Sequence, residues 1–202
     1  MKKILLLVIL ALAGVGAWYY WETRPKPNNE LAPLENHILS KHTPAFNASI
    51  DSLLSHYYTL SESFVNWDSG SVKQNAVALN EKIQNMHFDE FSKDTAVHQT
   101  VLSYKAEISK NLQAIINESD LTARRRTFHT LSQNMYDMLR SVQHDASKVY
   151  LQECPMAFND TETAIWLSKT ADIRNPYLGL YHPRYKSGML ECGEVKDSIA
   201  NK

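Results

Sequence analysis

The sequence predicts a mainly α-helical protein: an antiparallel four-helix bundle with a loop-rich C-terminal cap that contains one or two short strands. Three observations lead to this fold class. Apolar residues recur at spacings of three and four over residues 46–142, which is the period of an amphipathic helix. The connections between these stretches are short, as they are between antiparallel neighbours in a bundle. After Asp145 the pattern changes to strand-forming residues, prolines and glycines.

The N-terminus, residues 1–24, has the pattern of a secretory signal or a signal anchor. Lys2 and Lys3 precede a long apolar run that ends in the aromatic cluster "WYYW". The stretch Ile4 to Trp21 is about eighteen residues long, near the lower limit for crossing a bilayer. We favour an uncleaved membrane anchor over a signal cleaved after Ala17. Both alternatives place residues beyond about 25 outside the cytoplasm, where a disulfide is allowed.

A proline-containing linker is predicted over residues 25–43, and the helical bundle over residues 44–145. The first helix has an apolar stripe formed by Phe46, Ile50, Leu53, Tyr57, Leu60, Phe64 and Trp67. Three further stripes of the same period lie over residues 72–86, 97–115 and 121–142. We therefore expect one face of each helix to be buried in a shared core.

Short polar segments mark the ends of these helices. "DSGS", Asp68 to Ser71, ends the first stripe, and "NESD" supplies Ser119 or Asp120 as the N-cap of the fourth helix. The fourth helix then carries the basic cluster Arg124 to Arg126, for which a solvated helix face is expected rather than a phosphate-binding patch. The formal net charge is -1. No global field therefore attracts nucleic acid, and none is predicted as a partner.

The C-terminal cap, residues 146–202, has a different composition from the bundle. "KVYLQEC" and "AIWLS" favour strands, and the segment "RNPYLGLYHPRYKSG" must be mostly turn and loop. A loop-rich tail of this length is unusual in a compact domain, and it needs either a crosslink that holds it in place or a functional reason. The only two cysteines of the chain, Cys154 and Cys192, stand near its two ends.

The sequence contains no pattern that points strongly to catalysis. It lacks a glycine-rich phosphate loop, a nucleophile-elbow pattern and a CxxC redox motif. No catalytic residue and no organic cofactor are therefore predicted. An unrecognised enzyme that uses a cleft between bundle and cap remains as a third alternative.

A soft-metal site is one hypothesis for the two cysteines, because each has a methionine close by. Thiolate and thioether are soft ligands and match Cu(I). The expected ligands are Cys154, Met156, Met189 and Cys192, with His182 as an extra contributor from the loop between them. The alternative is a Cys154–Cys192 disulfide, which would close a loop of about 39 residues and stabilise the fold by roughly 3–4 kcal/mol. The methionines would then be ordinary packing residues.

The tail resembles a family of exported bacterial domains of unknown function, whose relatives also occur appended to the membrane-fusion subunits of copper and heavy-metal efflux pumps. The matching motifs are Cys154-Pro155-Met156, Trp166-Leu167-Ser168, Asn175-Pro176-Tyr177 with Gly179, and Met189-Leu190 with Cys192-Gly193. The resemblance is specific over residues 149–196 and looser over the helices. The insert "LYHPRYKSG" before Met189 is longer than in the family pattern.

This resemblance implies a periplasmic, membrane-anchored accessory to metal efflux or homeostasis, with a cation-efflux membrane-fusion protein as its partner. We therefore expect a non-catalytic protein that binds copper. The alternative is a structural or protein-interaction module that needs no cofactor and whose two cysteines form a disulfide.

Overall fold

The computed structural model describes Val15, residues 18–23 and residues 40–199, which fall into two separate units divided after Ile38. In the first unit, Val15 and residues 18–22 are helical, and the aromatic side chains of Trp18 to Trp21 are exposed. Among the described residues, no helix combines the length and the hydropathy needed to cross a bilayer. Most of the predicted anchor lies outside the described residues, so it stays a prediction.

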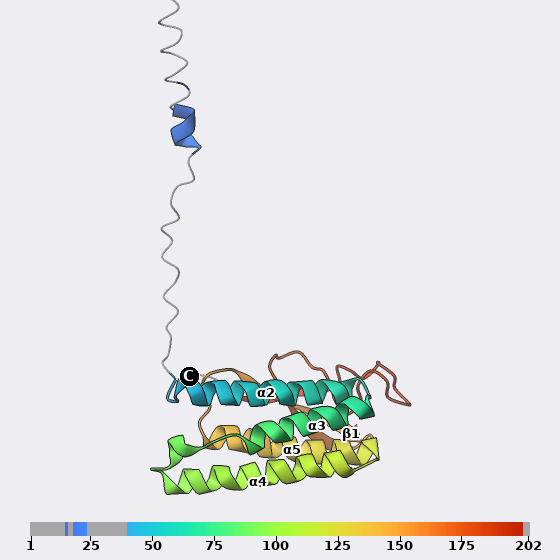
Figure 1. Cartoon of the computed structure of the whole chain (residues 1–202). Coiled ribbons are helices and arrows are strands. Elements are labelled where there is room, and N and C mark those ends of the chain that lie inside the picture. Colours follow the sequence, from blue (N-terminus) through green and yellow to red (C-terminus); the bar gives the residue numbers. More distant parts are fainter. Residues whose placement is uncertain (1–14, 16–17, 24–39, 200–202) are drawn as a thin grey trace, which may run out of the picture. The chain divides into compact units, whose positions relative to one another are not determined.

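The second unit contains four long helices: α2 (Pro44–Val65), α3 (Ser69–Gln84), α4 (Thr95–Asn117) and α5 (Leu121–Ser141). A short 3-10 helix, η1 (Asp89–Phe91), stands between α3 and α4. Consecutive helices pack against one another, and Figure 1 shows all four lying alongside each other. The mainly helical fold class predicted from the sequence is therefore confirmed.

Each long helix begins at a side chain that caps its free backbone N–H groups. Thr43, Asp68, Asp94 and Asp120 are the N-caps of α2, α3, α4 and α5. Asp120 Oδ1, for example, accepts from the backbone N–H of Ala123 at 2.7 Å. These polar caps allow a new helix to begin soon after the last one ends, as α3 does after α2 and α5 does after α4.

The apolar stripes of the helices meet in one core, as their spacing predicted. The first six residues of the α2 stripe are buried: Phe46, Ile50, Leu53, Tyr57, Leu60 and Phe64. The ring of Phe128 from α5 stacks on Tyr57 and packs against Phe64, with centroids 5.3 Å and 4.7 Å away. Trp67 lies beyond the end of α2, with φ 54°, and is half-buried.

The cap contains a three-stranded antiparallel sheet in the order β2-β1-β3. Its strands are β1 (Val149–Phe158), β2 (Glu162–Ser168) and β3 (Glu194–Ile199). The prediction of one or two short strands was therefore one strand too few. The missed strand, "EVKDSI", is mostly exposed and lacks the alternation of apolar and polar residues by which a half-buried strand is recognised.

Side chains of the helices and of the cap cover the free edge of β2. The backbone N–H of Leu167 donates to the Tyr57 hydroxyl at 3.0 Å, and that of Ile165 donates to His129 Nδ1 at 3.2 Å. The Tyr177 hydroxyl donates to the carbonyl of Ile165. An uncovered edge strand presents unpaired backbone groups to other chains. These three contacts remove that hazard and bind the sheet to the helices.

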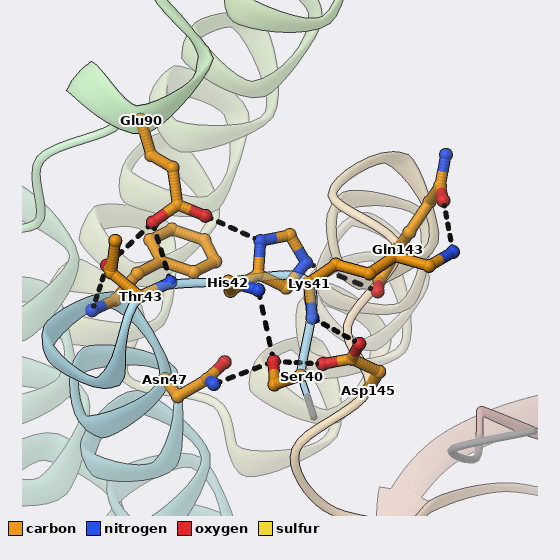
Figure 2. A network of polar contacts seen from close by, with 9 residues as sticks. Ser40, Lys41, His42, Thr43, Asn47, Glu90, Gln143 and Asp145 are labelled. Atoms are coloured by element: carbon orange, nitrogen blue, oxygen red, sulfur yellow. Dashed lines mark hydrogen bonds and ion pairs between the residues drawn. The ribbon is translucent and has the colours of Figure 1, made fainter. Parts of the chain in front are cut away.

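A network of polar contacts fastens residues 40–43 to the rest of the unit (Figure 2). Asp145 accepts from Ser40 Oγ at 2.5 Å and from the backbone N–H of Lys41 at 2.9 Å. Glu90 accepts from Thr43 Oγ1 and contacts His42 Nδ1, both at 2.7 Å. The last four residues of the segment predicted as a linker therefore belong to the folded unit.

Candidate functional site

The two cysteines, 38 positions apart, lie in direct contact, with their Sγ atoms 3.1 Å apart. Cys154 is fully buried in β1, the central strand of the sheet. Cys192 is half-buried in a turn, where its backbone N–H donates to the carbonyl of Met189 at 3.1 Å. Both are free thiols. The fold thus brings the two ends of the loop-rich tail together at the two sulfur atoms.

Asn175 holds the cysteine-containing turn in place. It is fully buried; its Nδ2 donates to the carbonyl of Cys192 at 2.7 Å, and its backbone N–H donates to the carbonyl of Leu190 at 2.9 Å. Its Oδ1 accepts from the backbone N–H groups of Tyr177 and Leu178. One amide side chain therefore ties the "NPY" turn to the turn before β3, a role that sequence reasoning missed.

Gly193 allows this turn to approach the sheet closely. Its φ is 146°, and a Cβ atom at this position would lie 2.7 Å from the carbonyl oxygen of Glu153 and 2.9 Å from the ring of Trp166. No larger side chain fits there without a shift of β1. The glycine after Cys192 therefore lets the turn, and with it the Cys192 sulfur, lie against the central strand.

Met156 and Met189 are half-buried and pack against the core. Residues two positions apart, such as Cys154 and Met156, lie on the same side of a regular strand. The pairing of β1 with β2 is irregular between Cys154 and Phe158. Strict alternation of side chains therefore does not apply to this part of β1.

His182, the predicted extra ligand, stands in a different environment from the cysteines. Its ring stacks on Tyr185 with centroids 5.0 Å apart, and it meets the ring of Trp67 edge-on at 5.3 Å. Within the described part of the chain, no three or more His, Cys, Asp or Glu side chains form a group that would hold a metal ion. His182 is therefore not a third ligand beside the two thiols in this arrangement.

The thiol pair can bind a soft ion only after it loses protons and separates. Burial, and then the contact with Cys154, raise the pKa of Cys192 above its usual range. Two thiolates each about 2.3 Å from one tetrahedral ion lie about 3.8 Å apart. The observed 3.1 Å is shorter. To hold such an ion, the two sulfurs would therefore have to move apart by about 0.7 Å.

A groove of about 840 Å³ runs between α2 and the cap. Its walls include Tyr58 and Glu62 from α2 and Trp166, Lys169 and Arg174 from the cap. Two residues of opposite walls are joined: the guanidinium of Arg174, from the cap, forms an ion pair with Glu62 of α2 at 2.5 Å. Its described lining contains no histidine and no cysteine, but it includes the carboxylates of Asp51, Glu62, Asp68 and Asp172.

The arginine cluster on α5 differs from the prediction of a solvated helix face. Arg124 and Arg125 are only 5% and 2% exposed. Arg124 donates to the carbonyls of Glu118 and Ser69, both at helix ends. Arg126 alone is exposed and pairs with Glu162 at 2.7 Å. The acceptors of Arg124 are thus a carbonyl at the C-terminal end of α4 and one at the start of α3, and a sequence pattern does not reveal such acceptors.

Comparison with known proteins finds a family model that matches part of the chain, residues 53–147. No curated protein and no solved structure matches the chain. The matched region covers most of α2 and all of α3, α4 and α5, but it contains neither cysteine. The resemblance noted from the tail motifs is therefore not what this comparison detects. Over residues 53–147, the chain is similar to a family described as protein of unknown function (DUF3347).

Proposed function

We propose that the reduced protein binds a soft metal ion, Cu(I), through the thiolates of Cys154 and Cys192. The observation that carries the proposal is the contact of the two sulfurs at 3.1 Å, made by residues 38 positions apart. Met156 and Met189, half-buried close to the cysteines in sequence, are the candidate thioether donors. A donor set of sulfur atoms selects Cu(I) over harder divalent ions.

The chemistry of the site supports storage or transfer of metal rather than catalysis. A thiol with a raised pKa stays protonated at neutral pH and is a poor nucleophile. Metal binding must displace those protons, so affinity should rise with pH. In this proposal α2–α5 act as an antiparallel four-helix bundle that carries the cap, on the periplasmic side of the membrane. The N-terminal segment is the anchor, and a cation-efflux membrane-fusion protein is the partner.

A second candidate, a non-catalytic interaction module stapled by a disulfide, is favoured by the same short distance. The sulfurs need to close from 3.1 Å to the bond length of about 2.05 Å. Closure of this loop would stabilise the folded state by about 4 kcal/mol on the chain-entropy estimate. Metal binding and a disulfide exclude one another, because oxidation removes the thiolates that the metal needs.

The deciding experiment is an anaerobic titration of the full chain with Cu(I) against a competing chelator, before and after oxidation. We expect about one Cu(I) per reduced chain and none per oxidised chain. Met156→Leu combined with Met189→Leu should weaken binding, since leucine conserves volume but removes both thioethers. Met86→Leu, a buried methionine of the helical region, is the control and should bind like wild type.

Absence of Cu(I) binding by the reduced wild type would refute the metal proposal. If the oxidised protein were then more resistant to urea than the reduced one by about 4 kcal/mol, the staple would be the better account. Unchanged affinity in the double methionine variant would leave only the two thiolates as ligands.

A further inference from the structure

Arg125 of α5 is a buried cation without a counter-ion among the described residues. The residue is 2% exposed, and its guanidinium lies over the ring of Trp67 at 3.9 Å from the centroid. Nε donates to the carbonyl of Pro176 at 3.0 Å and Nη2 to that of Phe64 at 2.8 Å. Nη1 is buried and has no hydrogen-bond partner in the part of the chain that the structure describes.

Two carbonyl acceptors and an aromatic ring do not neutralise this charge. Burial lowers the pKa of Arg125 to about 9, so the side chain still carries its charge at neutral pH. A buried charge that lacks both an opposite charge and a full set of hydrogen bonds is unfavourable. An anion that reached Nη1 would supply both the missing charge and the missing acceptor.

The carboxylates in the neighbourhood already have partners. Glu162 pairs with Arg126 at 2.7 Å and accepts from Asn159 Nδ2 at 2.5 Å. Asp160 pairs with Arg184 at 2.5 Å and accepts from the Tyr185 hydroxyl at 2.7 Å. The charge of Asp120 also acts on Arg125, but this carboxylate caps α5 through the backbone N–H of Ala123, and no ion pair joins it to Arg125 among the described residues.

A pocket of about 180 Å³ adjoins this cation. Arg125 lines it together with Trp67, Phe158 and His182, and its lining contains no aspartate or glutamate. His182 accepts at Nδ1 from the backbone N–H groups of Arg184 and Tyr185, both at 3.2 Å. In that state the neutral ring carries its proton on Nε2. Nε2 has no partner among the described residues and is a second donor for a ligand.

We propose that this pocket binds a carboxylate group attached to a small apolar or aromatic body, with Arg125 Nη1 and His182 Nε2 as its donors. The aromatic walls favour a flat apolar body beside the charged group. Because Arg126 is already neutralised by Glu162, the pocket offers one unbalanced positive charge, which suits a monoanion better than a phosphate dianion. The site is separate from the cysteine pair and does not depend on the proposed metal function.

The carboxylate has two possible sources, a free organic acid and the C-terminus of a peptide. Benzoate is the probe for the first source. For the second, the probe is a short peptide that ends in phenylalanine, compared with the same peptide amidated at its C-terminus. Sodium chloride and inorganic phosphate at matched ionic strength control for screening. The readout is the NMR signal of the Trp67 indole N–H in the full-length ¹⁵N-labelled chain, assigned by its loss in Trp67→Phe.

A saturable shift of this signal with benzoate, or with the free-acid peptide but not its amide, is the expected result and identifies the source. Ala157→Leu, which fills the pocket, should weaken the response at least tenfold, and His182→Phe should weaken it without filling the pocket. Arg140→Met removes an exposed arginine from the same helix and should change nothing. Arg125→Met should abolish binding, but the other two pocket variants keep the test valid if that variant does not fold.

Three results would overturn the proposal. The first is the absence of a saturable shift with either carboxylate probe. The second is an equal shift with chloride or phosphate, and the third is an undiminished response in Ala157→Leu, which would show that the anion does not occupy this pocket.

Discussion

Replacement of Tyr57 by phenylalanine should lower the free energy of unfolding by much more than the removal of a solvent-exposed hydroxyl would. The hydroxyl of Tyr57 lies 2.6 Å from Ser132 Oγ and accepts from the backbone N–H of Leu167 at 3.0 Å. Ser132 Oγ donates to the carbonyl of Phe128 at 2.7 Å, so Tyr57 must donate to Ser132. Burial raises the pKa of Tyr57, which keeps the hydroxyl a neutral donor.

The size of the effect follows from what the substitution leaves behind. Phenylalanine keeps the ring stacked on Phe128 but leaves the backbone N–H of Leu167 at the edge of the sheet without its acceptor. An unsatisfied buried donor costs about 1–3 kcal/mol. For a domain of this size, a loss of about 2 kcal/mol corresponds to a fall in melting temperature of about 4–8 °C.

Urea unfolding followed by circular dichroism measures this difference directly. Tyr58→Phe is the matched control, because the half-buried hydroxyl of Tyr58 has no hydrogen bond among the described residues, and its loss should stay within about 0.5 kcal/mol. If both variants unfolded at the same urea concentration as wild type, the hydroxyl of Tyr57 would not connect the sheet to the helices. Equal destabilisation by both variants would also contradict the reasoning.

Two further predictions concern the polar network and the "NPYLG" turn. Burial tends to raise the pKa of Glu90, but hydrogen bonds from Thr43 and His42 outweigh it and place the pKa below its ordinary value of 4.5. The stabilisation is complete above that value and is lost as pH falls through the lowered pKa. Urea midpoints should therefore decline in acid, and less steeply in Glu90→Gln; identical pH profiles would contradict this. Gly179→Ala should lower the free energy of unfolding by about 2–3 kcal/mol or more. The φ of this residue is +58°, and a Cβ atom would lie 2.5 Å from the carbonyl oxygen of Val65. A variant that unfolded at the same temperature as wild type would refute this prediction.

The helical part of the fold was predictable because each of its elements carries its own local signal. Six residues of the α2 stripe are buried at the spacing read from the sequence, and of the two predicted N-cap candidates, Ser119 and Asp120, it is Asp120 that caps α5. The strand β3 was not predictable in this way. Its residues gain their conformation from pairing with β1, which is a long-range contact that leaves no period in a mostly polar segment.

The candidate site was predictable in its residue types but not in its connections. Cys154 and Cys192 could be selected as a pair because they are the only cysteines. Nothing local indicated that Asn175 would bind the backbone of Cys192 or that Arg125 would be buried behind Trp67. Both side chains find backbone carbonyls of distant segments, and such acceptors exist only once the chain has folded.

The position of β3 in the sheet determines which strands can pair first while the chain is being synthesised. β1 is the central strand, yet one of its two neighbours is made of residues 194–199, which follow it by more than thirty positions. During synthesis at about 5–20 residues per second, the helices and the β1–β2 hairpin emerge first, and one side of β1 stays open for seconds. A chain stopped or cleaved before Glu194 would keep that open edge and would be a target for aggregation or quality-control proteases.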